Sequence, residues 1–112
     1  MKHYLVELYT PNAAWKALPA QDKQAWLASI QAAMGGLAAL GVELLSLSAI
    51  APGIAHNSQH QFIGIWRFES ASARDALLSG IQACGWYQYF DHLNAACESG
   101  SFETHLAALQ AA

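Results

Sequence analysis

The sequence predicts an α+β fold, a four-stranded antiparallel sheet with helices packed on one of its faces. Two observations predict it. Four short segments rich in β-branched and aromatic residues are interleaved with two longer segments of helical periodicity. Their order along the chain is strand, helix, strand, strand, helix, strand, followed by a short terminal helix. With 112 residues, we expect a single domain over residues 1–112, large enough for a core of its own.

The N-terminal half carries the first strand and the first long helix. Residues 3–9 alternate between an apolar face and a mixed face, which is typical of a half-buried strand. Thr10-Pro11-Asn12 breaks this strand, and Asn12 can cap a short turn. Pro19 opens the helix, because proline fits a first turn that needs no amide donor. Apolar residues at three- and four-residue steps continue to Leu40, and Gly41 is expected to end the helix.

The C-terminal half contains the other three strands. The second is expected at residues 42–50 and the third at residues 61–68, joined by a polar loop. Ser70 or Ser72 caps a second helix that runs from Ala73 to about Cys84. An aromatic stretch then leads into a fourth strand at residues 90–97. A terminal helix follows at residues 102–109, where Phe102, Leu106 and Leu109 are apolar.

This element order is the ferredoxin-like, or split βαβ, arrangement, a βαββαβ sandwich with a C-terminal helix. Its helices cover only one face of the sheet, and the other face carries apolar and aromatic groups that need a partner. Charged residues make up 12% of the chain, about half of the roughly 25% that is usual. The sequence therefore predicts a homodimer that buries the open face of the sheet.

Several other partners and locations are not expected. A net charge of −3 with five Lys and Arg residues argues against nucleic acid. Residues 25–42 carry no charge, but their large residues follow one stripe, whereas membrane-spanning helices are apolar all round. The first residues lack the features of a signal peptide. Cys84 and Cys97 are interpreted as reduced, buried small residues, and a cytoplasmic location is predicted.

Two stretches carry a resemblance to a known superfamily. One is the third strand with the small-residue helix start after it, from Phe62 to Ala73. The other is the turn Gly85-Trp86-Tyr87-Gln88-Tyr89-Phe90. With the element order, they resemble the dimeric α/β-barrel superfamily, including its antibiotic-biosynthesis-monooxygenase-like and YCII-like proteins, within an uncharacterised bacterial group. The resemblance implies two sheets packed face to face, with a cavity in each subunit.

The resemblance also bears on cofactors. Haem-degrading members and some monooxygenase members of the superfamily carry a histidine on the second helix. Residues 73–83 of this chain contain no histidine, so no haem ligand is expected there and no cofactor is predicted. His56 and His60 are four residues apart, but a loop does not align such a pair, and no metal site is predicted.

A polar group on the first and last strands is the candidate for catalysis. Alternation places His3 and Glu7 on one face of the first strand, and His92 and Asn94 on one face of the last. Their opposite faces look better suited to contact the helices, so the polar group is expected to point into the barrel. His92, with Glu7 or His3, could move a proton at neutral pH. The alternative is that these groups only form hydrogen bonds across a dimer interface.

The candidate binding residues are mostly aromatic. Such side chains commonly line pockets for flat or apolar ligands, although they also fill cores and interfaces. The parity of the third strand leaves open whether Trp66 or Arg67 faces the cavity, and Arg67 would favour an anionic ligand. The predicted substrate-binding residues are Trp66, Asn94, Tyr9, Arg67 and Phe90.

Two functions follow from these features. The chain either binds a small apolar or aromatic molecule in the barrel cavity without catalysis, or acts as a cofactor-independent enzyme. In the second case it would be a monooxygenase or isomerase-like enzyme for an aromatic or enolisable small molecule. The residues do not separate these alternatives.

Overall fold

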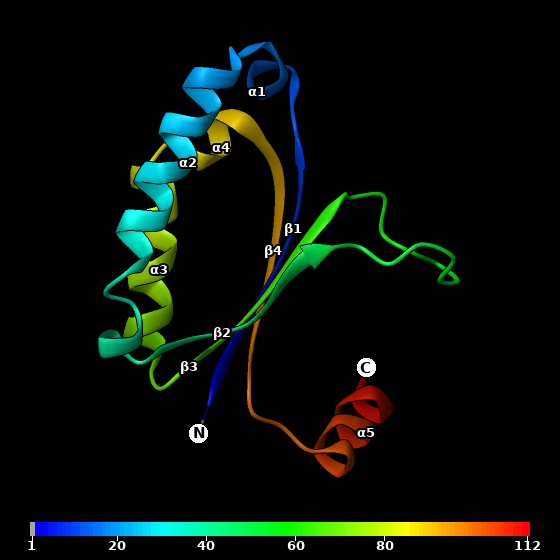
Figure 1. Cartoon of the computed structure of the whole chain (residues 1–112). Coiled ribbons are helices and arrows are strands. Elements are labelled where there is room, and N and C mark those ends of the chain that lie inside the picture. The colour runs from blue at the N-terminus through cyan, green and yellow to red at the C-terminus, as the bar shows by residue number, and fades with distance from the viewer. Residues whose placement is uncertain (1) are drawn as a thin grey trace.

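The computed structural model describes residues 2–112 and contains one four-stranded antiparallel sheet with helices, so the predicted ferredoxin-like α+β fold is confirmed (Figure 1). The elements are β1 (His3–Pro11), α1 (Ala13–Ala17), α2 (Ala20–Met34), the 3₁₀ turn η1 (Ala38–Leu40), β2 (Val42–Ala49), β3 (Phe62–Phe68), α3 (Ala71–Ala83), α4 (Trp86–Tyr89), β4 (Phe90–Glu98) and α5 (Phe102–Ala111).

The strands lie in the order β2-β3-β1-β4, and every neighbouring pair is antiparallel. Helices α2 and α3 both lie on one side of the sheet (Figure 1). The register of the central strands brings residues of the candidate functional site opposite one another. Glu7 on β1 lies opposite Gly64 on β3 and Asn94 on β4, and Tyr9 lies opposite His92.

The first long helix is shorter than predicted. It ends at Met34, and the chain passes through η1 before Gly41 adopts a left-handed conformation at φ 80°. The prediction of one helix up to Leu40 is therefore wrong. Glycines 35 and 36 explain the difference, because each costs about 1 kcal/mol relative to alanine within a helix. The predicted cap of the second helix is confirmed at Ser70, whose Oγ accepts the amide hydrogen of Ala73.

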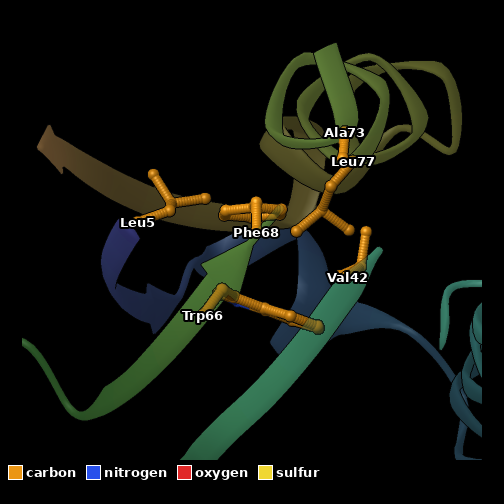
Figure 2. Close-up of a cluster of buried hydrophobic side chains, with 6 residues drawn as sticks. All are labelled: Leu5, Val42, Trp66, Phe68, Ala73 and Leu77. Atoms are coloured by element: carbon orange, nitrogen blue, oxygen red, sulfur yellow. The ribbon is translucent and has the colours of Figure 1, made fainter. Parts of the chain in front are cut away.

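The hydrophobic core lies between the sheet and the helices (Figure 2). Strands β1, β2 and β3 contribute to it from one side and α3 from the other. Leu5 and Phe68 are fully buried there. The core cluster consists of Leu5, Val42, Trp66, Phe68, Ala73 and Leu77.

The core corrects the predicted orientation of β1 and β4. Leu5 faces the helices, and so do the residues that alternate in phase with it, among them Glu7 on β1 and His92 on β4. The polar group was expected to point away from the helices, and this expectation is wrong. Both faces of β1 carry apolar residues, so alternation alone could not decide which face meets the helices.

The opposite face of the sheet has no cover within residues 2–112. Val6 pairs there with Ile65, and Leu8 lies between Ile63 and Leu93. Leu93 is 55% exposed. Cys97, which was predicted to be buried, is exposed because it lies near the end of the edge strand β4 on this face. We call this surface the open face.

Helix α5 stands apart from the other helices, on the side of the sheet away from α2 and α3 (Figure 1). None of its residues is buried. Within residues 2–112, no helix combines the length and the apolar character needed to cross a membrane.

Candidate functional site

A cavity of about 180 Å³ lies between the sheet and helices α2 and α3. Most of its wall is aliphatic or aromatic, and Glu7 is its one residue with a charged side chain. The remaining lining comes from α2, α3, β1, β2, β3 and α4, together with Leu37 after α2 and Cys84 after α3. The lining residues are Glu7, Tyr9, Ile30, Ala33, Met34, Leu37, Leu47, Trp66, Ala76, Leu77, Gly80, Ile81, Cys84 and Trp86.

Glu7 is held in place by β3. The residue is 4% exposed, and its Oε2 accepts a hydrogen bond of 2.8 Å from the indole Nε1 of Trp66. Gly64 makes room for this pair. A Cβ atom at position 64 would lie 2.9 Å from Glu7 Oε2 and 2.8 Å from the Leu47 side chain. A glycine in a strand is typical of such a close approach.

The surroundings of Glu7 change its acidity. Burial raises the pKa of the Glu7 carboxyl above its ordinary value of 4.5, although the hydrogen bond from Trp66 and the nearby His92 act in the opposite direction. Burial also raises the pKa of Tyr9, and the Glu7 carboxylate adds to this effect. A carboxyl group of this kind can hold a proton closer to neutral pH than an exposed one.

His92 is oriented by two hydrogen bonds. The indole Nε1 of Trp86 lies 2.9 Å from His92 Nδ1, and because an indole N–H can only donate, Nδ1 carries a lone pair. The proton of the neutral ring is therefore on Nε2, which donates to Asn94 Oδ1 at 2.7 Å. Tyr9 stacks on the imidazole with an interplanar angle of 6°. Both ring nitrogens are thus engaged.

The Glu7 and His92 side chains approach each other but do not form a hydrogen bond. His92 Nε2 lies 3.7 Å from Glu7 Oε1, which is beyond hydrogen-bond distance. Glu7 Oε1 accepts no hydrogen bond from any residue between 2 and 112. This oxygen can therefore accept a hydrogen bond from a ligand, and His92 Nε2 is the imidazole nitrogen that lies near it.

The structure brings together three of the predicted site residues in the cavity wall: Glu7, Tyr9 and Trp66. The alternation of β3 left open whether Trp66 or Arg67 faces the cavity, and the structure shows that Trp66 lines it. Arg67, its neighbour in sequence, points to the opposite face of the strand and forms an ion pair with Glu43. The expectation that Arg67 binds substrate in the cavity is therefore wrong.

The remaining predicted residues lie outside the cavity wall. His3 is on the same face as Glu7, but four residues along a strand correspond to about 13 Å. It lies beside Glu98 instead, with 3.9 Å between His3 Nδ1 and Glu98 Oε1, so the His3–Glu7 pair does not form. Asn94 Oδ1 accepts a hydrogen bond from His92 Nε2–H, and Phe90 stacks on Trp86 with ring centroids 4.2 Å apart.

Some residues of the site were not found from the sequence. Trp86 orients His92, and Gly64 makes space for the carboxylate. Gly64 stands inside a strand of bulky residues, which is a signal that could have identified it. The α2 and α3 residues of the wall had no such signal, because aliphatic residues on a helix face are normally core. Among residues 2–112, no group of three His, Cys, Asp or Glu side chains is arranged to hold a metal ion.

Comparison with known proteins places the chain in a family. Residues 2–112 match the family of unknown function DUF6616, and the chain belongs to that family. No curated protein matches the sequence.

Solved structures show the same fold. A chlorite dismutase variant from Candidatus Nitrospira defluvii matches 97% of this chain with a TM-score of 0.66 and 10% identity. The chain spans about half, 47%, of the chlorite dismutase chain. A dimeric ferredoxin-like protein of unknown function from Thermobifida fusca has a TM-score of 0.53 and 12% identity, with 88% of this chain and 92% of that chain covered. A hypothetical protein of Arabidopsis thaliana has a TM-score of 0.54 and 12% sequence identity, with 88% of each chain covered.

Proposed function

We propose that this protein binds a small, mainly apolar molecule with a single hydroxyl or similar donor in the cavity beneath α2 and α3. The observation that carries the proposal is the combination of an apolar wall with one oxygen of the Glu7 carboxylate, Oε1, that accepts no hydrogen bond from residues 2–112. Ligand pockets are generally lined in this way, with a few polar groups that fix orientation.

The size of the cavity limits the ligand. An apolar cavity of about 150 Å³ is known to take benzene. The 180 Å³ here therefore fits a compound with one ring or a short branched chain. A neutral donor suits the site better than an anion, because the one charged side chain in the wall is itself a carboxylate. A phenol-like compound meets both conditions.

Binding of phenol and toluene tests this proposal. The two probes have similar size, and only phenol can donate a hydrogen bond to Glu7. We expect phenol to bind more tightly than toluene, and Glu7→Leu to remove this preference while keeping toluene binding. Glu43→Leu, on the open face beside Arg67, is the matched control and should change neither value. Equal affinities of the unmodified protein for both probes would contradict the role of Glu7.

A second candidate function rests on the raised pKa of Glu7. A buried carboxylate next to an apolar ligand can act as a general base. Glu7 Oε1 would accept a proton from a carbon or hydroxyl of the substrate, leaving an enolate or phenolate and a neutral Glu7. Return of the proton to another carbon completes an isomerisation. In the monooxygenase route expected from the superfamily resemblance, the carbanion of a CH₂ group adds O₂, the peroxide takes the proton back from Glu7, and loss of water leaves a carbonyl.

In this second reading His92 is a positioning residue, not the base. Its Nδ1 is held by Trp86 and its Nε2–H by Asn94. Hydrogen–deuterium exchange at the α-carbon of cyclohexanone, a one-ring enolisable probe, tests the base directly. Exchange that is accelerated by the protein and lost in Glu7→Gln would support catalysis. Exchange no faster than in buffer alone would contradict the catalytic function, and the proposed binding function would still stand.

The assembly proposed for the chain is a homodimer through the open face. The chain exposes 7527 Å², whereas a compact 12.0 kDa protein exposes about 6,000 Å². Its radius of gyration is 16.2 Å, against about 13 Å for a compact domain of this length. The excess of roughly 1,500 Å² is larger than the roughly 800 Å² that each partner buries in an interface of standard size. A cytoplasmic location stays a prediction.

A further inference from the structure

Helix α5 has an apolar stripe that nothing in the chain covers. Phe102, Leu106 and Leu109 follow one another at four- and three-residue steps and therefore share one side of the helix. They are 77%, 47% and 57% exposed. The helix itself is well formed at its start, because Ser101 Oγ accepts the amide hydrogen of Thr104.

A helix of this kind needs a surface to pack on. It has ten residues, and isolated helices shorter than about 12–15 residues are marginal in water. The strand before it is fixed up to Ser99, whose amide donates to the Lys2 carbonyl at 2.9 Å. Only Gly100 and Ser101 separate this anchor from the helix. The helix is therefore held out beside the sheet on the side away from α2 and α3 (Figure 1).

The position of α5 points to a second copy of the chain as its partner. The helix stands on the same side as the open face, where the proposed dimer places the other protomer. When two sheets pack face to face about a two-fold axis parallel to their strands, the β4 edge of one lies opposite the β2 edge of the other. Helix α5 directly follows β4, and the β2 edge exposes Leu45 at its bulge. Leu44 and Leu47, which pair with Trp66 and Gly64, face the helix side instead.

We propose that α5 packs its apolar stripe against the β2 edge of a second copy, so that each protomer holds the other with its C-terminal helix. The inference rests on the proposed homodimer and adds a contact to it. The single chain exposes more surface than a compact protein of its mass, and α5, which has no buried residue, contributes to that surface. The proposed contact would bury this part of it. The interface then includes two α5 contacts in addition to the two open faces.

Disulfide trapping between two chains tests this contact. In a background with Cys84→Ser and Cys97→Ser, one chain carries Leu45→Cys and the other carries Leu106→Cys. On mixing and oxidation we expect a disulfide that joins the two different chains, identified by mass spectrometry. Ala107→Cys, one residue further along on another side of α5, is the matched control and should cross-link at least tenfold less. A disulfide that forms within one chain carrying both cysteines, and not between chains, would overturn the proposal.

A second measurement does not depend on the cysteine variants. Leu106→Asp should weaken the dimer by at least tenfold in sedimentation equilibrium, and Ala107→Asp should leave its dissociation constant unchanged. A dimer that is equally tight in both variants, with no cross-link between chains, overturns the role of α5 but leaves the open-face dimer standing. An unmodified chain that is monomeric overturns both.

Discussion

The two faces of one sheet are used differently, although the same strands supply both. On the helix side, β1 and β3 place Leu5, Phe68 and Trp66 in a closed core next to an apolar cavity. On the open face the same strands present Val6 and Ile65 with no cover from residues 2–112. The helix side contains the buried charge of Glu7, and the open face carries exposed charge in the Arg67–Glu43 pair and at Asp91.

The difference separates two roles. A buried carboxylate in an apolar cavity lowers stability unless it serves another purpose, because an ionised group loses its hydration there. An apolar surface without buried charge has the composition of the centre of a protein–protein interface. We therefore interpret the helix side as the ligand site and the open face as the assembly surface.

The largest effect is expected in the core. Phe68→Ala should lower the free energy of unfolding by about 3–5 kcal/mol, because the ring is fully buried. Denaturant unfolding measures the loss, which should be much the same at every protein concentration. Ile65→Ala, on the open face, should cost less at low protein concentration than at high. A concentration-independent loss at Ile65 would contradict the division between the faces.

The assembly surface is tested by a charge placed on its β4 side. Leu93→Asp should weaken the dimer at least 100-fold, about 2.7 kcal/mol, because a carboxylate would be buried without a partner. Light scattering over a dilution series measures the change. Leu27→Asp on α2 is the matched control, since Leu27 is 48% exposed and Leu93 is 55% exposed. Equal weakening by both variants would argue against the open face as the interface.

A smaller effect is expected from the partner of the buried carboxylate. Trp66→Phe keeps the ring packing but removes the hydrogen bond to Glu7, which should cost about 1–3 kcal/mol at neutral pH. The loss should shrink in acid, where Glu7 is protonated and its charge no longer needs a donor. Thermal unfolding at several pH values measures it. A loss that is independent of pH would show that Trp66 contributes by packing alone.

The smallest effect concerns the charge of Glu7 itself. Its pKa is higher in the folded chain than the ordinary 4.5, so the folded state binds a proton more strongly than the unfolded state does. Stability from this group is complete below pH 4.5 and is lost as the pH rises through the folded pKa. Glu7→Gln should therefore stabilise the protein by about 1 kcal/mol at neutral pH, and the gain should disappear below pH 4.5. A gain that persists in acid would contradict this origin.

The fold could be predicted from the sequence because each element has its own local signal. The alternation of residues 3–9 and the cap at Ser70 need no knowledge of the rest of the chain. The side on which the site lies depends on packing, and β1 is apolar on both faces, so its alternation fits either orientation. Arg67 was predicted to bind substrate because the alternation of residues along β3 also fits either orientation.

The contacts within the site depend on strand register. Glu7 was identified as a candidate from its strand position, but its bond to Trp66 and the space at Gly64 arise only when β1 and β3 pair as they do. The helix residues of the wall depend on how α2 and α3 pack. His92 was singled out correctly as part of a polar group, and its proton position depends on Trp86, which lies on another element.

The most direct test of the account follows the indole N–H signals of the four tryptophans in an NMR titration with phenol. Trp66 and Trp86 line the cavity, and Trp15 does not. The account predicts saturable shifts at Trp66 and Trp86, with Trp15 unmoved, and a weaker response in Glu7→Leu. No saturable shift at Trp66, or a shift at Trp15 as large as that at Trp66, would contradict the claim that the ligand site lies between the sheet and the helices.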